Sequence, residues 1–205
     1  MSDTKIKLCG LSRTEDILAA NELAPDYIGF VFAKGSRRYV SPDDAKRLRE
    51  LADSRIKTVG VFVDAPEEEV AALVRDGIID IVQLHGGEDR EYIERIRCLG
   101  AKEIIKAFKI TGSRDMEAAK ATSADVILLD SGRGGGLVFN WELIGDLRRP
   151  YFLAGGLDCD NVAKAIATLS PYGIDVSSGI ETGGIKDPDK MRRFVMTVRS
   201  MMLKN

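Results

Sequence analysis

The chain has 205 residues, of which 44% are hydrophobic and 30% are charged, and its formal net charge at pH 7 is −2. The length suits one globular domain, or at most two small ones, and the composition is sufficient for a core. The chain lacks the basic excess typical of proteins that bind nucleic acid or anionic membranes. No apolar run approaches the roughly 18 residues of a membrane span, and the polar N-terminus lacks the apolar segment of a signal peptide. We therefore expect a cytoplasmic protein with neither nucleic-acid nor membrane partners.

The cysteine and histidine content limits the metal and disulfide chemistry. Cys9, Cys98 and Cys159 are odd in number and far apart in the sequence, which argues against a disulfide framework or a thiolate zinc site. His85 is the only histidine, which excludes a site with several histidine ligands but leaves a carboxylate site open. The cysteine usage indicates a reducing, cytoplasmic environment.

Strand-like and helix-like segments alternate along the whole chain. The predicted strands, in chain order, cover residues 5–9, 26–32, 58–63, 80–85, 103–108, 125–130, 151–154 and 173–177. The predicted helices cover residues 12–24, a segment that begins at 42, and residues 64–77, 89–99, 114–122, 141–147, a segment from 158 or 160 to 169, and 187–203.

Capping residues mark several of these helix starts. Ser12 and Glu15 have the spacing of a capping box, in which a glutamate follows a serine by three residues. Ser41 precedes Pro42, and proline is favoured in the first turn of a helix. Pro25 ends the first predicted helix.

Strict alternation of strands and helices requires parallel strands joined by right-handed crossovers. Eight such units over residues 1–205 predict a single-domain (β/α)8 TIM barrel, although the chain is shorter than the ~250 residues typical of that fold. The alternative is an open, doubly wound sheet. It would carry a dinucleotide-binding G-x-G-x-x-G motif after the first strand, and the segment 9–13, Cys-Gly-Leu-Ser-Arg, does not match that motif.

In a barrel, alternate residues of each strand point inward, and active sites lie at the C-terminal rim. The inward groups nearest that rim are Cys9, His85, Asp130 and Ser177. When a thiol and a carboxylate face each other across the mouth, one of them can donate a proton to a substrate and the other can remove one. The alternatives are that Cys9 is an inert buried side chain and that Asp130 is a turn or cap residue. His85 is expected to be structural or to shape the substrate site.

The charged residues of the predicted strands and of the loop after the second strand suggest further contacts. Lys106 on the fifth strand is placed inside the barrel. Lys7 and Asp175, on neighbouring strands, are expected to form a buried ion pair. Arg37 and Arg38, on the loop after the second strand, either clamp a carboxylate or are exposed surface residues.

Small residues follow the seventh and eighth strands. Gly155 and Gly156, and then Ser177, Ser178 and Gly179, allow backbone N–H groups to approach an anion, which predicts a phosphorylated ligand. The loop 131–136 contains four glycines and is expected to be either a mobile lid over the site or a plain flexible connection.

Together these motifs resemble the phosphoribosylanthranilate isomerase family. The resemblance covers nearly the whole chain in the correct order, and the combination of Cys-Gly on the first strand, Gln-Leu-His-Gly and Asp-Val-Ser-Ser-Gly is specific to it. The matching segments are 7–10, 29–32, 36–42, 59–63, 83–86, 128–130, 153–157, 161–162 and 175–181.

The resemblance implies an Amadori rearrangement of N-(5-phosphoribosyl)anthranilate in tryptophan biosynthesis, without a cofactor or a metal. Asp130 matches the family's general acid and Cys9 its general base. Arg38 matches the group that faces the anthranilate carboxylate. The remaining substrate-binding residues expected from the motifs are His85, Gly155, Gly156, Asp175, Ser177, Ser178 and Gly179.

Two features qualify what the resemblance implies. The loop after Asp130 is shorter than the family pattern, and Leu137 occupies the position of the family's lysine. A thiol has an ordinary pKa of about 8.5, so a base role for Cys9 needs help from the local field, for which Lys7 is the candidate. The chain is expected to be a monomer or a homodimer.

Two other functions remain open at this point. One is a bifunctional isomerase that serves histidine and tryptophan synthesis, against which Cys9 argues because a carboxylate would be expected on the first strand. The other is a non-catalytic barrel that binds a phosphorylated ligand, which would not need an acid–base pair.

Overall fold

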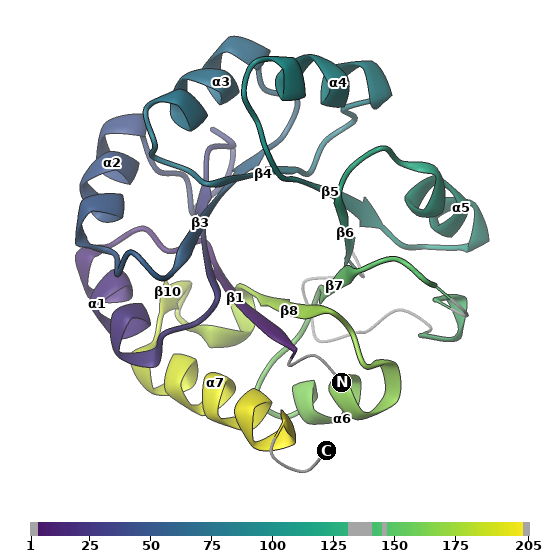
Figure 1. Ribbon diagram of the computed structural model, residues 1–205. Helices are drawn as coiled ribbons and strands as arrows, with labels where there is room; N and C mark the ends of the chain where they lie inside the picture. The colour runs from purple at the N-terminus through teal and green to yellow at the C-terminus, as the bar shows by residue number, and fades with distance from the viewer. Residues whose placement is uncertain (1–3, 131–140, 145–146, 203–205) are drawn as a thin grey trace.

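Eight parallel strands form a closed barrel in the order β1 to β8, with helices around the outside (Figure 1), which confirms the predicted (β/α)8 fold. The computed structural model describes residues 4–130, 141–144 and 147–202. Within these residues, no helix combines the length and the hydropathy that a membrane crossing requires. The predicted lid, residues 131–136, lies outside the described residues.

The elements follow the predicted order with small changes at their ends. The barrel strands are β1 (Lys5–Cys9), β2 (Tyr27–Val31), β3 (Lys57–Phe62), β4 (Ile81–Leu84), β5 (Ile104–Lys109), β6 (Val126–Asp130), β7 (Tyr151–Ala154) and β8 (Gly173–Val176). The helices are α1 (Thr14–Leu23), α2 (Pro42–Leu51), α3 (Glu67–Arg75), α4 (Arg90–Cys98), α5 (Ser113–Ala121), α6 (Val162–Leu169) and α7 (Pro188–Met202).

The predicted capping box of the first helix is wrong by one residue. The helix begins at Thr14, and Asp16 rather than Glu15 accepts hydrogen bonds from the backbone N–H groups of Ser12 and Arg13, at 3.0 and 3.1 Å. Ser41 caps α2 as expected, because its hydroxyl accepts from the Asp44 N–H at 3.1 Å.

Two connections differ from a plain strand–helix unit. After β6, the described residues contain only the short 3₁₀ helix η1 (Trp141–Leu143) where a helix over 141–147 was predicted. After β8, the chain forms the 3₁₀ helix η2 (Ser178–Ile180) and a two-stranded hairpin, β9 (Glu181–Thr182) and β10 (Ile185–Lys186), before α7 begins. This hairpin is too short to leave a periodic signal in the sequence.

Apolar side chains fill the barrel interior at its N-terminal end. Phe152 makes edge-to-face contacts with Tyr27 and Tyr172, with ring centroids 5.5 and 5.6 Å apart. Gly173 lies opposite Phe152 in the strand register, and a Cβ atom there would come within 2.3 Å of the Phe152 ring. Because this end is filled, the space for a ligand is at the opposite, C-terminal end.

A larger apolar layer lies between the strands and the helices. The alternation predicted for β1, β6 and β8 is confirmed: Ile6 and Leu8 belong to the outer layer, as do Ile174 and Val176, whereas Val126 and Leu128 pack inside the barrel. Lys7 and Cys9 on β1 therefore point inward.

The inward placement of Lys106 is wrong. Ile105 and Ala107 are the β5 residues that pack inside the barrel, so Lys106 faces the outer layer. There its Nζ donates to Glu88 Oε2 and to the Gly86 carbonyl oxygen, both at 2.7 Å. The β5 sequence is apolar on both sides of the lysine, which makes the direction of the alternation ambiguous.

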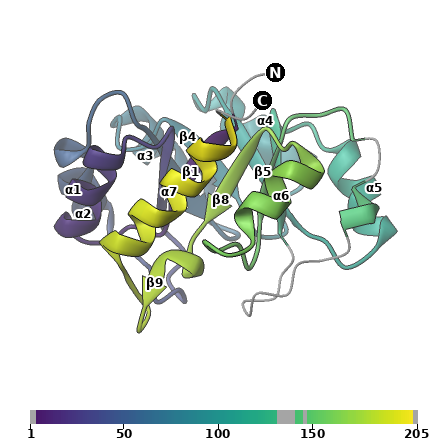
Figure 2. The same ribbon diagram turned by 90° about the horizontal axis from the view of Figure 1, so that it is seen from below.

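The C-terminal ends of the strands carry the loops that build the site. In Figure 2 the β9 hairpin lies at the lower end of the molecule, and both chain termini are labelled at the upper end. Helix α7 packs against α1 and α6 and thereby closes the ring of helices next to β1 and β8.

Candidate active site

A cavity of about 430 Å³ lies at the C-terminal mouth of the barrel. It is lined by residues from seven of the eight strands or the loops that follow them, so no single element defines it. All of the predicted site residues except Gly179 line it. These are Cys9, Arg38, His85, Asp130, Gly155, Gly156, Asp175, Ser177 and Ser178.

Cys9 is the last residue of β1, and its thiol is buried at the mouth. Gly29 is its neighbour in the strand register, and a Cβ atom at Gly29 would come within 2.7 Å of the Cys9 sulfur. Burial raises the pKa of the Cys9 thiol above its ordinary value, and the ammonium of Lys7 opposes this shift without cancelling it. The expected help from Lys7 is therefore present but outweighed, and the resting thiol is protonated at neutral pH.

Lys7 and Asp175 form the expected buried ion pair beneath the mouth. Lys7 Nζ lies 2.9 Å from Asp175 Oδ1, and the lysine side chain is completely buried. Burial by itself lowers the pKa of Lys7, but the charge of Asp175 and its hydrogen bond raise that pKa above its ordinary value. Lys7 therefore keeps its positive charge near the thiol, and the negative charge of Asp175 partly offsets its effect there.

Replacing Lys7 with methionine is expected to lower the free energy of unfolding by about 3–5 kcal/mol, because the Asp175 carboxylate would be left buried without its partner. Chemical denaturation followed by circular dichroism measures this. Arg90→Met is the control, since the Arg90–Glu94 pair is exposed and its loss is expected to leave the free energy of unfolding nearly unchanged. A decrease in the free energy of unfolding below about 1 kcal/mol for Lys7→Met would show that the Lys7–Asp175 pair does not stabilise the fold.

Asp130 ends β6 and lies beside His85. The ring Nε2 of His85 is 3.4 Å from Asp130 Oδ2, and its Nδ1 is 3.4 Å from the amide nitrogen of Gln83. The backbone holds both residues, because the His85 N–H donates to the Phe62 carbonyl oxygen and the Asp130 carbonyl oxygen accepts from the Ile110 N–H, each at 2.8 Å.

Gln83 also lines the cavity and was not selected from the sequence. Its side chain is almost completely buried, and its Oε1 atom has no hydrogen-bond partner among the described residues. Such a buried acceptor is costly unless a ligand supplies a donor. The Gln-Leu-His-Gly motif contained this signal, since Gln83 and His85 lie on the same face of the strand.

Cys9 and Asp130 belong to non-adjacent strands. On the shorter way around the barrel, β8 and β7 lie between them. Both line the same cavity, so a ligand there can contact the thiol from one side and the carboxylate from the other. This arrangement suits a reaction in which one group donates a proton and the other removes one.

The loops after β7 and β8 form one side of the mouth. Gly155 and Gly156 adopt positive φ angles of 82° and 66°. Gly179 does not line the cavity. A Cβ atom there would come within 1.9 Å of the Leu157 carbonyl oxygen, so Gly179 allows the two loops to pack together. The two loops therefore pack against each other, and Gly155, Gly156, Ser177 and Ser178 line the cavity where an anion is expected.

Arg38 lies at the mouth and is held by Glu181. Its Nε donates to Glu181 Oε1 at 2.6 Å and its Nη2 to Glu181 Oε2 at 2.9 Å. Among the described residues, its Nη1 makes no hydrogen bond. Arg37, in contrast, has a side chain that is 61% exposed and does not line the cavity. The structure thus places Arg38, which the resemblance selected, at the cavity and Arg37 outside it.

Within the described residues, no cluster of three or more histidine, cysteine or acidic side chains has the arrangement of a metal site. Glu181 and Lys186 were also missed from the sequence. Glu181 ends the matched segment 175–181 but has no obvious role there, and Lys186 lies in the unpredicted hairpin.

Comparison with known proteins shows that nearly the whole chain is similar to one family of enzymes. The family described as N-(5′-phosphoribosyl)anthranilate (PRA) isomerase matches residues 6–197. The N-(5′-phosphoribosyl)anthranilate isomerase of Endomicrobium trichonymphae is 44% identical over 202 residues, covering 96% of this chain and 99% of the relative.

Solved structures agree with the sequence match. A phosphoribosyl anthranilate isomerase in complex with reduced 1-(o-carboxyphenylamino)-1-deoxyribulose 5-phosphate has a TM-score of 0.85 and 35% identity, covering 96% of this chain and 99% of the other. Monomers of the dimeric enzyme from Thermotoga maritima have a TM-score of 0.86 and 36% identity, covering 96% and 99% of the two chains.

Proposed function

Because the chain belongs to the N-(5′-phosphoribosyl)anthranilate isomerase family, we propose that its mouth cavity performs this isomerisation with Asp130 as general acid and Cys9 as general base. The reaction is the Amadori rearrangement of N-(5-phosphoribosyl)anthranilate to 1-(2-carboxyphenylamino)-1-deoxyribulose 5-phosphate, a step of tryptophan biosynthesis. The observation that carries the assignment is the single cavity lined by a buried thiol and a carboxylate from non-adjacent strands.

Asp130 begins the reaction. Its carboxylic acid donates a proton to the ring oxygen of the ribose, the C1′–O bond breaks, and the ring opens to a protonated Schiff base with the anthranilate nitrogen. Asp130 is left as a carboxylate. The His85 ring, 3.4 Å away, lies within contact distance of this carboxylate. Opening the ring first makes the C2′ proton acidic, because the cationic nitrogen accepts the electron pair.

Cys9 completes the reaction. Its thiolate removes the C2′ proton, the electron pair forms a C1′–C2′ double bond, and the product is an enolamine. Tautomerisation to the ketone returns a proton to C1′. Since burial raises the pKa of the Cys9 thiol, the reactive thiolate is a minor form at neutral pH. Lys7 stabilises this form through its positive charge.

The two ends of the substrate are anionic, and the mouth offers a binding group for each of them. Arg38 faces the anthranilate carboxylate, and the backbone around Gly156, Ser177 and Ser178 binds the phosphate. Gly155 and Gly179 shape these loops, and His85 and Asp175 complete the wall. The roles of Arg38, Gly156, Ser177 and Ser178 are carried over from the family motif to the matching positions.

Arg38→Ala is expected to raise KM by about 10–100-fold with a much smaller change in kcat, because a charge-assisted contact to the substrate carboxylate is lost. Steady-state kinetics measures both constants. Arg55→Ala is the control, because that side chain is 79% exposed and outside the cavity, and the KM of this variant is expected to stay within about threefold of the unmodified protein's. An unchanged KM for Arg38→Ala would remove Arg38 from the carboxylate subsite.

Finer assignments extend the proposal. The enzyme class is an intramolecular oxidoreductase that interconverts an aldose and a ketose, and residues 1–205 form its catalytic domain. The protein acts in the cytoplasm as a monomer or homodimer, and the dimeric relative from Thermotoga maritima supports the second form.

Genetic complementation tests the function. The gene is expected to restore growth without tryptophan to a bacterial strain that lacks its own phosphoribosylanthranilate isomerase. A folded, expressed protein that does not restore growth would contradict the proposed function.

A further inference from the structure

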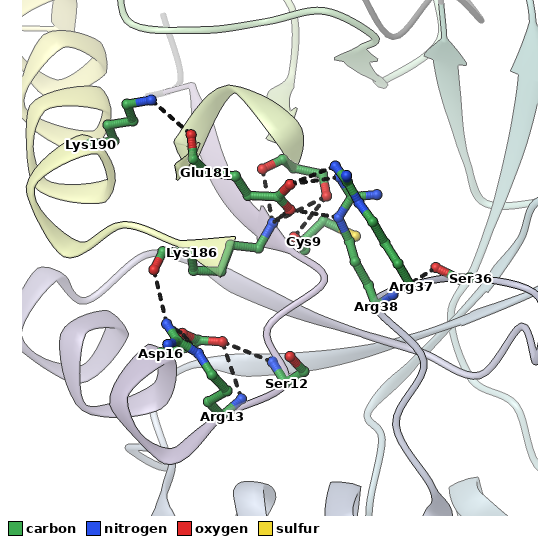
Figure 3. A network of polar contacts seen from close by, with 11 residues as sticks. Cys9, Ser12, Arg13, Asp16, Ser36, Arg37, Arg38, Glu181, Lys186 and Lys190 are labelled. Atoms are coloured by element: carbon green, nitrogen blue, oxygen red, sulfur yellow. Dashed lines mark hydrogen bonds and ion pairs between the residues drawn. The ribbon is translucent and has the colours of Figure 1, made fainter. Parts of the chain in front are cut away.

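Glu181 joins two parts of the mouth through its carboxylate. It begins the hairpin after β8, and its side chain is 4% exposed. Its Oε1 accepts hydrogen bonds from Arg38 Nε at 2.6 Å and from Lys186 Nζ at 2.7 Å, and its Oε2 accepts from Arg37 Nη2 at 2.9 Å (Figure 3). One oxygen atom therefore links an arginine of the β2–α2 loop to a lysine of the hairpin.

Lys186 continues this link to the end of β8. Its side chain is 2% exposed, and its Nζ donates to the Ser177 carbonyl oxygen at 2.8 Å and to the Ser177 hydroxyl at 3.2 Å. The same hydroxyl donates to the Cys9 carbonyl oxygen at 3.1 Å. Lys186 thereby fixes the backbone immediately before Ser178, where the phosphate is proposed to bind.

The charges in this cluster do not balance. Burial raises the pKa of Glu181, but hydrogen bonds from Arg38 and Lys186 outweigh this effect, so the pKa is below its ordinary value and the side chain is ionised. Three cationic side chains, Arg37, Arg38 and Lys186, surround this one carboxylate. The adjacent Arg13–Asp16 pair is neutral in sum and contacts Lys186 only through its carbonyl oxygen. The cluster thus has excess positive charge, which suits a ligand with an anion at each end.

We propose that Glu181 is a positioning residue that holds the carboxylate-binding and phosphate-binding parts of the mouth in register, through Arg38 on one side and Lys186 on the other. This inference rests on the proposed function for the identity of the two anionic groups. Glu181 does not contact the reacting atoms. It acts by fixing the position of each binding group, Arg38 on one side and the backbone next to Lys186 on the other, so its loss affects both ends of the substrate.

The test is to measure the binding of two probes, anthranilate and inorganic phosphate, to folded variants by ligand-observed NMR titration. Glu181→Gln keeps the shape of the side chain but removes the charge. It is expected to raise both dissociation constants by about tenfold or more. Arg38→Ala is expected to raise the constant for anthranilate only, and Lys186→Met the constant for phosphate only.

Lys190→Met is the matched control. Lys190 Nζ contacts Glu181 through its backbone carbonyl oxygen, at 2.7 Å, and not through its carboxylate. Both dissociation constants are expected to stay within about twofold of those of the unmodified protein. This variant separates the role of the carboxylate from a general disturbance of the hairpin.

The pattern across the variants decides the outcome. A Glu181→Gln protein that loses affinity for one probe only, or for neither, would overturn the proposal. If Glu181→Gln does not fold, Glu181→Asp replaces it, because the shorter carboxylate cannot keep both Arg38 and Lys186 at their present distances. Loss of affinity for both probes in that variant supports the proposal, and unchanged affinity overturns it.

The proposed function is tested separately by the turnover of phosphoribosylanthranilate in the unmodified protein. If that protein binds both probes with the expected dependence on Glu181 but does not turn over the substrate, the function fails and the positioning role stands. If it turns over the substrate while Glu181→Gln binds both probes normally, the positioning role fails alone.

Discussion

Cys9→Ala is expected to lower turnover by about 10²–10⁴-fold while substrate binding survives, because the variant loses the general base and little else. The thiol is buried at the end of β1, and its removal leaves the strand and the neighbouring ion pair in place. Steady-state kinetics gives kcat, and binding of a product analogue gives the affinity.

Cys98→Ala is the matched control for this variant. Cys98 is exposed at the end of α4, away from the mouth, and its replacement is expected to leave turnover unchanged. Unchanged turnover in Cys9→Ala would remove the thiol from the mechanism.

The same assignment predicts a pH dependence. The base is the thiolate, so kcat/KM rises with pH as Cys9 loses its proton. Since burial raises the pKa of this thiol above its ordinary value, the rise is expected to continue into the alkaline range, beyond the pKa of about 8.5 of an ordinary thiol. The residual activity of Cys9→Ala is expected to lack this rise.

Asp130→Asn is expected to lower kcat by about 10²–10⁴-fold, because an amide of nearly the same shape cannot donate the proton that opens the ribose ring. The asparagine side chain keeps its position beside His85, so the variant loses the acidic proton without a change in the shape of the site. Asp76→Asn is the control, since Asp76 is an exposed carboxylate at the end of α3 and its replacement is expected to have no effect. Full activity in Asp130→Asn would contradict the acid assignment.

The two variants are also expected to stop the reaction at different points. Asp130→Asn blocks ring opening, so no open-chain intermediate forms. Cys9→Ala permits ring opening but not the loss of the C2′ proton. Rapid-quench analysis with trapping of the Schiff base by borohydride distinguishes these cases, and a trapped open-chain species is expected only with Cys9→Ala.

The barrel could be predicted from the sequence because its strands carry a strong pattern. On β1 and β8, the alternation of polar and apolar residues shows which side of the strand faces the barrel interior. On β6, which is otherwise apolar, the polar residue at the rim, Asp130, shows it. On β5 both sides are apolar around Lys106, and the pattern alone gives no direction. Lys106 was therefore placed inside, whereas the structure pairs it with Glu88 in the outer layer.

The site residues at strand ends could be predicted for the same reason, since strand ends meet at one rim in this fold. The positions of Cys9 and Asp130 make them candidates, and the family resemblance supplies their proposed roles. Glu181 and Lys186 could not be found this way, because they lie in a hairpin of two-residue strands with no periodicity. Their role depends on contacts between Glu181 and Arg38, which are 143 residues apart in the chain, and between Lys186 and Ser177, which are 9 residues apart.

Gln83 shows a different limit. The sequence places it on the inward face of β4, but only the structure reveals that its Oε1 atom is buried without a partner among the described residues. An unsatisfied acceptor is a property of the folded cavity and not of any motif. The same applies to Gly179, whose motif position suggested phosphate contact while the structure shows close packing between two loops.

The most direct test of the account is a fluorescence assay of the purified, unmodified protein with freshly generated phosphoribosylanthranilate. The account predicts loss of the substrate's emission well above the rate of spontaneous hydrolysis, with the deoxyribulose phosphate as product. Loss no faster than hydrolysis, in a folded protein that still binds phosphate, would contradict catalysis and would favour a barrel that only binds phosphorylated ligands.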